Sequence, residues 1–312
     1  MLYDLIGVPE SELSSFLEDV DGAIVNNGSH YKHKKTSAHS SVSLKFDKFI
    51  LENVLKHIQD KKPTQGAFAK KSIKELLNPH KNQKYIFISD IKQYFENINY
   101  SDVAEEIKKC TQIANSVEMV KDVYFTKDDQ LKRGLKASAP ISEIVGLKID
   151  SLINSIIHEN SSKALTYTRY YDDLMISSDN IEDLKIFKKK LEEKLNSSLG
   201  LKLNVKKSRL RVLQGTKALG MRYHNGQVRP TQKYKKKLRA IIFQYKHSDY
   251  DENDIYDVYA AKKHVGTVIG SIRYLLDNKP DESEPYEELL ADHYEELNRL
   301  DDIAKELSEY EE

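Results

Sequence analysis

Hydrophobic residues recur along this chain with two different spacings, which together predict a mixed α+β fold. Steps of three and four residues are typical of a helix with one buried face, whereas short runs of β-branched and aromatic residues are typical of strands. Helices are predicted within residues 1–25, over 42–60, 101–110, 181–195, 232–243, 260–276 and 284–310, and within 134–152 after an initial loop. Strands are predicted at 85–88, 123–126 and 201–205 and in two hairpins, 166–177 and 223–230. The polar segment 26–41 is expected to be a loop or a short hairpin.

The first predicted hairpin, TYTRYYDDLMIS at 166–177, has two adjacent acids at its tip. Asp172 and Asp173 are expected in the turn between the two strands, because Asp is a good turn residue. Two neighbouring carboxylates raise each other's pKa unless a cation lies between them. An isolated pair of this kind usually belongs to a surface turn, so its surroundings decide the interpretation.

A third acid, Asp90, follows the apolar run in the segment KYIFISDIKQYFE at 84–96. A carboxylate at the end of a buried strand can lie beside the tip of a neighbouring hairpin. Hard divalent cations prefer oxygen ligands and often share them with substrate phosphates. If Asp90, Asp172 and Asp173 meet, we expect them to form a magnesium site.

Five ordered motifs resemble those of the reverse transcriptases. YYDD at 170–173 is similar to the Y-x-D-D motif of that family, and Asp90 with Phe95 is similar to its first palm motif. The other three are LKASAPIS at 135–142, which resembles a degraded L-P-Q-G-A-P-T-S, LNVKKS at 203–208, which resembles L-N-x-x-K-T, and ALGMRY at 218–223, which resembles the F-L-G turn that grips the primer. The compact size and the run HNGQVRPTQKYKKKLRA look most like the bacterial retron and abortive-infection defence enzymes.

The resemblance implies a right-hand polymerase architecture with small fingers, an antiparallel-sheet palm and a helical thumb. The implied divisions are the N-terminal part of the fingers at 1–80, the palm at 81–230 with a fingers excursion at about 100–140, and the thumb with an acidic C-terminal helix at 231–312. QGAFAKKSIKELLNPH at 65–80 resembles a stretch that retron enzymes carry before the first palm motif. Its histidine, His80, is expected to have a structural role, as most lone histidines do.

The resemblance also assigns roles to individual residues. Asp90, Asp172, Asp173 and Lys207 are expected to be catalytic, with Lys207 donating a proton to the leaving pyrophosphate. The expected ligands of two Mg²⁺ ions are Asp90, Ile91, Asp172 and Asp173, of which Asp90 and Asp172 would bridge the two ions. The residues expected to bind the nucleotide are Tyr94, Phe95, Ala139, Pro140, Ser142, Lys34 and Lys35, and Phe95 would exclude a 2′-hydroxyl. The residues expected to bind the primer or other nucleic acid are Tyr170, Lys206, Arg209, Leu219, Gly220, Arg229, Lys233, Lys235, Lys236 and Lys237.

The chain departs from the family pattern in three places. Lys136, Ala137, Ser138 and Glu143 stand where the family has proline, glutamine, glycine and a second proline. The usual fingers pattern K-x-x-G-x-x-R-x-I is not found, so Lys34 and Lys35 are the available cations for a triphosphate. Retron enzymes carry V-T-G where this chain has ALG at 218–220. These differences leave templated synthesis and retron membership open.

Charge is unevenly distributed, although the formal net charge of the 312 residues is zero. The block 202–239 contains thirteen Lys and Arg and no acid, whereas 277–312 contains fifteen acids and three bases. A basic block beside candidate catalytic acids is expected for a protein that binds a phosphate backbone, and the missing counter-charges favour this interpretation over a solvated helix face. A single cysteine, no apolar run of membrane-spanning length and an acidic N-terminal segment predict a cytoplasmic protein without a membrane partner.

The predicted function is therefore that of an RNA-directed DNA polymerase which extends a primer on a cognate structured non-coding RNA. Its partners would be that RNA, the DNA product and deoxynucleoside triphosphates, and the family resemblance indicates antiphage defence. Two alternatives stay open: protein-primed or template-independent DNA synthesis of the abortive-infection type, and a non-catalytic RNA-binding scaffold. The sequence identifies neither an effector protein nor the oligomeric state, and a homo-oligomer is compatible with it.

Overall fold

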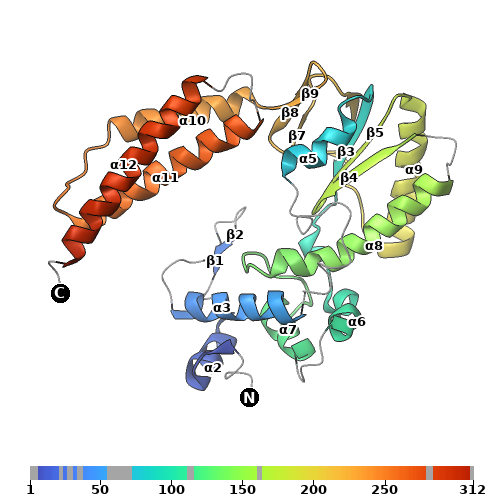
Figure 1. Ribbon diagram of the computed structural model, residues 1–312. Helices are drawn as coiled ribbons and strands as arrows, with labels where there is room; N and C mark the ends of the chain where they lie inside the picture. Colours follow the sequence, from blue (N-terminus) through green and yellow to red (C-terminus); the bar gives the residue numbers. More distant parts are fainter. Residues whose placement is uncertain are drawn as a thin grey trace. The chain divides into compact units, whose positions relative to one another are not determined.

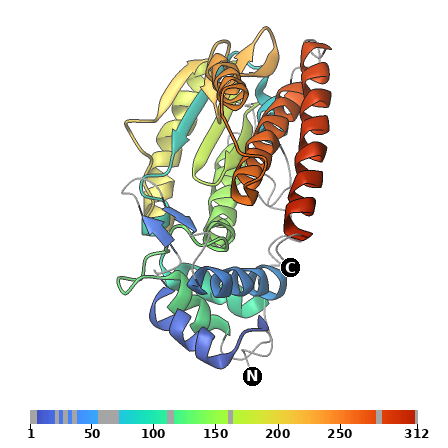
Figure 2. The same ribbon diagram turned by 90° about the vertical axis from the view of Figure 1, so that its left-hand side faces the viewer.

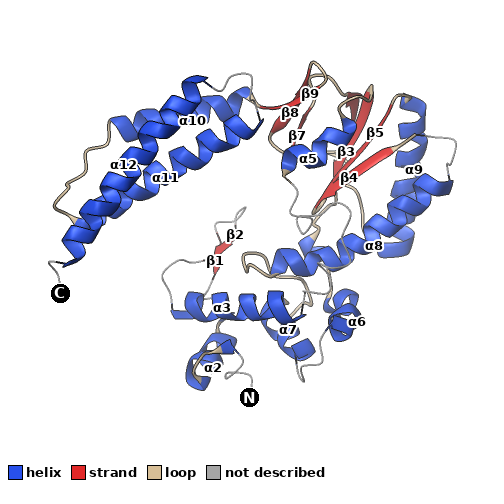
Figure 3. Ribbon diagram, in the orientation of Figure 1, coloured by secondary structure: helices blue, strands red, loops and turns tan. Residues whose placement is uncertain are grey.

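The computed structural model describes residues 6–20, 24–26, 31–33, 38–54, 72–110, 116–159, 164–278 and 284–309. The chain divides into two compact units. The first comprises residues 1–72 and 83–212, and the second comprises 73–82 and 213–312. Figure 3 shows that both units combine helices with short strands, which confirms the predicted α+β class.

Each unit has its own set of helices and strands. In sequence order, the first unit contains α2 (Glu10–Glu18), β1 (Ile24–Asn26), β2 (Tyr31–His33), α3 (Ala38–Phe49), the π-helix η2 (Ile50–Val54), β3 (Tyr85–Asp90), the 3-10 helix η5 (Phe95–Asn97), α6 (Tyr100–Cys110), α7 (Ser116–Tyr124), α8 (Ser138–Glu159), β4 (Thr166–Tyr170), β5 (Asp173–Ser178), α9 (Ile181–Leu199) and β6 (Arg209–Val212). The second unit contains α5 (Ile73–Leu77), the 3-10 helix η4 (Asn78–His80), β7 (Lys217–Ala218), β8 (Met221–His224), β9 (Gln227–Pro230), α10 (Gln232–Lys246), α11 (Ile255–Asn278) and α12 (Glu284–Glu309).

A four-stranded antiparallel sheet in the order β4-β5-β3-β6 forms the core of the first unit (Figure 1). β3 lies inside this sheet and pairs with β5 from Tyr85 opposite Ser178 to Asp90 opposite Asp173. Its apolar residues Ile86 and Phe87 are fully buried. Burial on both faces explains why the sequence of β3 is nearly continuous in hydrophobic residues rather than alternating.

Helix α9 covers part of this sheet and packs against α8 (Figure 1). Its buried side chains, Leu184, Phe187, Leu191 and Leu195, are spaced by three and four residues. Asn180 caps the helix by accepting a hydrogen bond from the backbone N–H of Glu182. Gly200 ends it in the left-handed conformation with φ of 65°, which glycine adopts without steric cost.

A second group of helices in the first unit surrounds aromatic side chains. α2 packs against α3, as both Figure 1 and Figure 2 show, and the rings of Phe16 and Phe46 lie 6.4 Å apart between them. The ring of Phe46 also lies 6.0 Å from that of Tyr124 at the end of α7. These contacts join the N-terminal helices to the segment between β3 and α8.

Several predicted elements differ from those in the structure. The expected strand at 123–126 is the end of α7 and a single bridge between Phe125 and Leu131. The expected strand at 201–205 is limited to a bridge between Leu203 and Ile91, because Lys207 and Ser208 donate to the carbonyl of Asn204 and close a turn. The strand β6 follows that turn. Segment 26–41 contains β2, which pairs with β1 as a hairpin, and the start of α3, whereas residues 55–60 of the predicted helix 42–60 lie outside the described residues.

The second unit contains a small antiparallel sheet, β7-β8-β9, and three long helices. The turn between β8 and β9 is Asn225-Gly226, with φ of 49° and 69°, as the hairpin prediction requires. α11 contacts both α10 and α12 (Figure 1) and buries Val265 and Ile272. No helix among the described residues combines the length and apolarity needed to cross a membrane.

His80 gives the second unit a predicted dependence on pH. Its side chain is fully buried, as expected for a structural histidine, and burial lowers its pKa from 6.5 to about 4. In the unfolded chain His80 binds a proton near pH 6.5, whereas in the folded chain it does so only near pH 4. The contribution of His80 to folding stability should therefore fall as the pH drops from 6.5 to 4. The loss should reach about 3 kcal/mol, because one pKa unit corresponds to about 1.4 kcal/mol. The difference between the wild type and a His80→Gln chain in urea unfolding between pH 7 and 4 measures this loss, because Asp173, whose pKa is raised to about 6, contributes in the opposite direction in both chains.

Candidate active site

The sheet register brings the three predicted acids to one edge of the sheet. Asp90 ends β3 and lies directly opposite Asp173, the first residue of β5. The backbone N–H of Ile91 donates to the carbonyl of Asp172 at 3.1 Å, which fixes the hairpin tip against the end of β3. The turn itself consists of Tyr171 and Asp172, so Asp173 belongs to the strand and not to the turn as predicted.

The backbone of this turn is in an uncommon conformation. Tyr171 has a φ of 52°, in the left-handed region that bulky residues rarely adopt. Its ring packs edge-on against that of Tyr170, with centroids 5.0 Å apart. Such a conformation persists only where surrounding contacts hold it, and it sets the directions in which the following two carboxylates point.

Electrostatic effects at the tip agree with three close negative charges. Burial raises the pKa of Asp173 to about 6, and the charges of Asp172 and Asp90 contribute to this rise. Burial also raises the pKa of Asp172, while the positive charges of Lys207 and Arg133 act in the opposite direction. Like charges directly opposite one another destabilise a strand pair, so the folded chain retains an unfavourable cluster at this edge.

Lys207 and Asn204 complete the surroundings of Asp90. The Nζ atom of Lys207 donates to Oδ2 of Asp90 at 2.8 Å, and this bond raises the pKa of the lysine. The backbone N–H of Asn204 donates to the carbonyl of Asp90 at 2.8 Å, and the carbonyl of Asn204 accepts from the backbone N–H of Lys207. Asn204 was not among the predicted site residues, although its place in the L-N-x-x-K motif was a signal for it.

The donor atoms at this edge fit a divalent cation by their chemistry. Oδ1 of Asp90 is buried and has no hydrogen-bond partner among the described residues, while Oδ2 faces the positive charge of Lys207. Carboxylate oxygens are the ligands that Mg²⁺ and similar ions prefer. Among the described residues, however, no group of three or more histidine, cysteine or acidic side chains is arranged so that it could hold a metal ion as it stands.

Two aromatic residues follow Asp90 and differ in their surroundings. Tyr94 is buried, and its hydroxyl donates to the carbonyl of Ser142 at 2.6 Å. Phe95 is half-buried, and the guanidinium carbon of Arg133 lies 5.5 Å from the centre of its ring. Arg133 also forms an ion pair with Glu96 at 2.6 Å. The structure therefore adds a cation near the carboxylates that sequence reasoning did not select.

The segment that departs from the family pattern is held by buried contacts. Asp47 of α3 accepts hydrogen bonds from the backbone N–H groups of Lys136 and Ala137, at 3.1 and 3.0 Å, and from the hydroxyl of Tyr124. Near the start of α8, Ser142 is fully buried and donates its hydroxyl hydrogen to the carbonyl of Ala139. The side chain of Ser142 thus supports the turn of the helix. The other two predicted nucleotide-binding residues near the start of α8, Ala139 and Pro140, are both half-buried.

A hollow of about 480 Å³ lies beside the loop that contains Asn204. It is lined by Lys92, Gln93, Leu203, Asn204, Val205 and Lys206. Lys206 belongs to the predicted nucleic-acid-binding set, and Arg209 of the same set is exposed on the edge strand β6. Tyr170, the remaining member of that set in the first unit, is half-buried at the hairpin tip.

The other predicted nucleic-acid-binding residues belong to the second unit. Leu219 and Gly220 form the turn between β7 and β8, with φ of 49° and 79°. Lys233, Lys236 and Lys237 are exposed on α10, Lys235 is half-buried there, and Arg229 of β9 bonds to the side chain of Gln227. Lys34 and Lys35, the predicted triphosphate-binding cations, lie outside the described residues.

Comparisons with known proteins agree with the motifs. A family model described as reverse transcriptase (RNA-dependent DNA polymerase) matches residues 32–223. Among curated proteins, the chain is similar to the retron Ec73 reverse transcriptase of Escherichia coli, with 24% identity over 191 residues that cover 56% of this chain and 60% of the relative. The chain thus matches only 60% of the length of that relative.

Among solved structures, two similar chains are telomerases in the apo state. One, from Candida tropicalis, has a TM-score of 0.43 and 12% identity, over 86% of this chain and 64% of that chain. The other, the same telomerase truncated from its C-terminal domain, has a TM-score of 0.42 and 15% identity, over 64% of this chain and 49% of that chain. The family model carries the assignment, because it spans more than half of the sequence: this chain belongs to the reverse transcriptase family.

Proposed function

We propose that this protein synthesises DNA on an RNA template by nucleotidyl transfer. The observation that carries the proposal is the meeting of Asp90, Asp172 and Asp173 at one sheet edge, beside Lys207. A cluster of like charges that weakens the fold is expected where a cation and substrate phosphates compensate it. Membership of the reverse transcriptase family supports the same conclusion.

In the proposed reaction, the 3′-oxygen of a primer attacks the α-phosphorus of a deoxynucleoside triphosphate, and the bond to pyrophosphate breaks. Two divalent ions, which we take to be Mg²⁺, would when bound lower the pKa of the primer hydroxyl and stabilise the charge of the transferred phosphate. Asp90 and Asp172 would hold both, with Asp173 and the carbonyl of Ile91 as further donors. Lys207 is charged at neutral pH and is mostly exposed, so its Nζ can supply a proton to the departing pyrophosphate.

Phe95 is proposed to distinguish deoxynucleotides from ribonucleotides. Its half-buried ring follows Asp90 closely in sequence and would lie under the sugar, where a 2′-hydroxyl would clash with it. Phe95→Ala should therefore raise the ratio of kcat/KM for ATP to that for dATP by about 10- to 200-fold. Ile186→Ala, which removes an exposed apolar side chain from α9, should leave this ratio unchanged. An unchanged ratio in Phe95→Ala would assign the ring to packing alone.

The template and partner are proposed from the relatives and from charge. The similarity to a retron reverse transcriptase supports RNA as the template. From the resemblance of the sequence motifs we further propose that this template is a cognate structured RNA and that the biological setting is antiphage defence. The exposed lysines of α10 provide a positive surface for a phosphate backbone, to which affinity should fall steeply as salt rises. The electrostatic contribution of that backbone does not depend on base sequence, so recognition of one RNA would rest on its folded shape.

The experiment that tests the proposal supplies the purified chain with a heteropolymeric RNA, an annealed DNA primer, four deoxynucleotides and Mg²⁺. Complementary DNA that is absent with Asp90→Asn establishes templated synthesis. A homopolymer, or DNA linked to protein, would instead support template-independent or protein-primed synthesis, which the residues Lys136, Ala137 and Ser138 make the main alternative. If the chain binds RNA but incorporates no nucleotide, and if the nucleic acid recovered with it from native cells is RNA alone, the protein would be a non-catalytic RNA-binding scaffold.

A further inference from the structure

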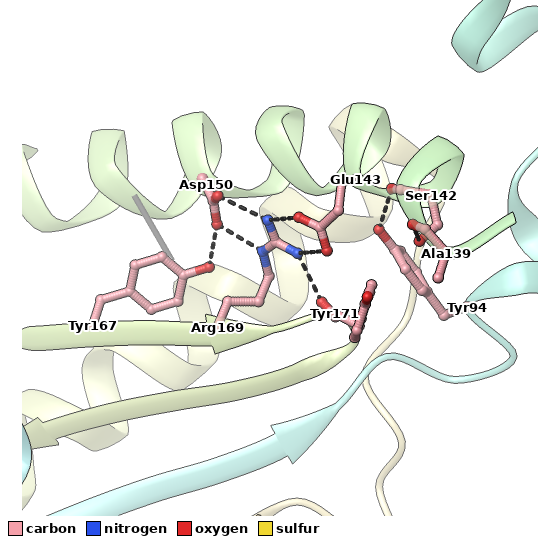
Figure 4. Close-up of polar contacts among 8 residues, drawn as sticks. All are labelled: Tyr94, Ala139, Ser142, Glu143, Asp150, Tyr167, Arg169 and Tyr171. Carbon is pink, nitrogen blue, oxygen red and sulfur yellow. Dashed lines mark hydrogen bonds and ion pairs between the residues drawn. The ribbon is translucent and has the colours of Figure 1, made fainter. Parts of the chain in front are cut away.

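Arg169 of β4 lies at the centre of a buried polar network beside the hairpin tip (Figure 4). Its side chain is fully buried and pairs with Glu143 and Asp150, both on α8. A guanidinium has five N–H donors, and all five are used in this network. Nε donates to Asp150 Oδ1 at 2.8 Å, Nη1 to Glu143 Oε1 at 3.0 Å and to the carbonyl of Tyr171 at 3.0 Å, and Nη2 to Glu143 Oε2 and Asp150 Oδ2 at 2.9 Å each.

The bond to Tyr171 connects this network to the carboxylates. Tyr171 is the turn residue with positive φ, and its carbonyl belongs to the peptide bond that leads into Asp172. The two oxygens of Glu143 and of Asp150 hold the guanidinium in one orientation, and the hydroxyl of Tyr167 donates to Asp150 at 2.6 Å. Figure 4 shows the guanidinium between α8 and the hairpin, with these partners around it. A rigid helix thus fixes the backbone immediately before Asp172.

A glycine provides independent support for the role of this arginine. Gly146 lies inside α8, where glycine costs about 1 kcal/mol relative to alanine. A Cβ atom at this position would lie 2.6 Å from both Nη1 and Nη2 of Arg169. The absent methyl group therefore makes room for the guanidinium, which its five hydrogen bonds prevent from moving aside.

We propose that Arg169 is a positioning residue: by holding the carbonyl of Tyr171 against α8, it places Asp172 and Asp173 for binding of divalent cations. Glu143 stands where the family has a proline. Its negative charge compensates the buried positive charge of Arg169, which accounts for this departure from the family pattern. Lysine cannot replace Arg169, because one ammonium group has three donors and no planar fork. This inference rests on the proposed polymerase function for its biological meaning, but not for its test.

The test measures binding of Mn²⁺ to the purified full chain without nucleic acid, by electron paramagnetic resonance, together with kcat for DNA synthesis. Gly146→Ala and Arg169→Lys should each lower the affinity for Mn²⁺ by about 10- to 100-fold and lower kcat by a similar factor. Changes of this size are typical when a residue that orients a metal ligand is replaced. The dissociation constant for primer–template should stay nearly unchanged. Ser155→Ala, an exposed change on the same helix, is the matched control and should match the wild type.

A merely structural role would lower the thermal unfolding temperature without changing Mn²⁺ affinity per folded molecule. Wild-type Mn²⁺ affinity in folded Gly146→Ala would overturn the inference. If that chain or Arg169→Lys fails to fold, Glu143→Gln, which keeps the shape of the side chain but breaks one of its two bonds to the guanidinium, decides the question by the same comparison. A wild-type chain that binds Mn²⁺ but adds no nucleotide would reject the polymerase function alone, because the binding measurement is independent of it.

Discussion

Replacing Asp172 by asparagine should reduce DNA synthesis by about 10³-fold or more, since charge stabilisation at the reacting phosphate is usually the largest contribution to catalysis. The change keeps the size of the side chain and removes one negative charge from the cluster with Asp90 and Asp173. Binding of labelled primer–template should remain, because the exposed lysines of α10 are unaffected. Single-turnover incorporation and filter binding, measured on one preparation, separate these two effects.

A matched control for this change is Asp128→Asn, which makes the same chemical substitution at an exposed position. It should synthesise DNA at the wild-type rate. Equal rates for Asp172→Asn and the wild type would exclude the carboxylate cluster as the catalytic site. Loss of primer–template binding together with synthesis would instead assign Asp172 to the nucleic-acid surface.

Replacing Arg169 by methionine should lower the free energy of unfolding by about 3–5 kcal/mol, because breaking a buried ion pair by removing one partner leaves uncompensated charge in a medium of low dielectric constant. Two carboxylates would be left, with Glu143 fully buried and Asp150 nearly so. Burial alone would lower the pKa of the guanidinium, but the bonds to these carboxylates raise it, so the arginine is always charged. Urea unfolding at neutral pH measures the loss.

A double-mutant cycle separates the contribution of uncompensated charge to this loss from the contribution of lost side-chain packing. In a chain that carries Glu143→Gln and Asp150→Asn, no buried negative charge depends on Arg169, so Arg169→Met should cost much less than in the wild type. An equal cost in both backgrounds would attribute the effect to side-chain volume. Lys185→Met, which breaks an exposed ion pair with Glu182, should change stability by less than about 1 kcal/mol.

The sequence predicted the parts of the site whose residues repeat with a regular spacing. The apolar run of β3 and the hairpin around Tyr170 were visible as strands, and the position of Asp90 at a strand end followed from them. The carboxylate cluster could be predicted because antiparallel pairing brings strand ends together. The prediction of the turn at Asp172 and Asp173 was wrong by one residue, since the turn consists of Tyr171 and Asp172.

The parts that sequence reasoning missed depend on contacts between distant segments. β6 is an edge strand whose residues are mostly exposed, so it lacks the hydrophobic pattern on which strand prediction rests. The sequence analysis assigned no role to Arg169, because its partners Glu143 and Asp150 belong to a distant helix. Arg133 and Asp47 likewise acquire their neighbours only through packing. The second unit includes segment 73–82, which precedes β3 in sequence and gives no local sign of belonging elsewhere.

The pairing of β3 also has a consequence for how the protein is made on the ribosome. β3 forms hydrogen bonds only with β5 and β6 within its sheet, and both follow it after α6, α7 and α8. At ordinary rates of translation, β3 is therefore synthesised several seconds before its partner strands. During this time its apolar side chains are not covered by the sheet, and an unpaired strand is prone to aggregate. Contacts between such distant segments also slow folding. The catalytic centre should thus be the last part of the first unit to form, and a nascent chain that stops before β5 should depend on chaperones to stay in solution.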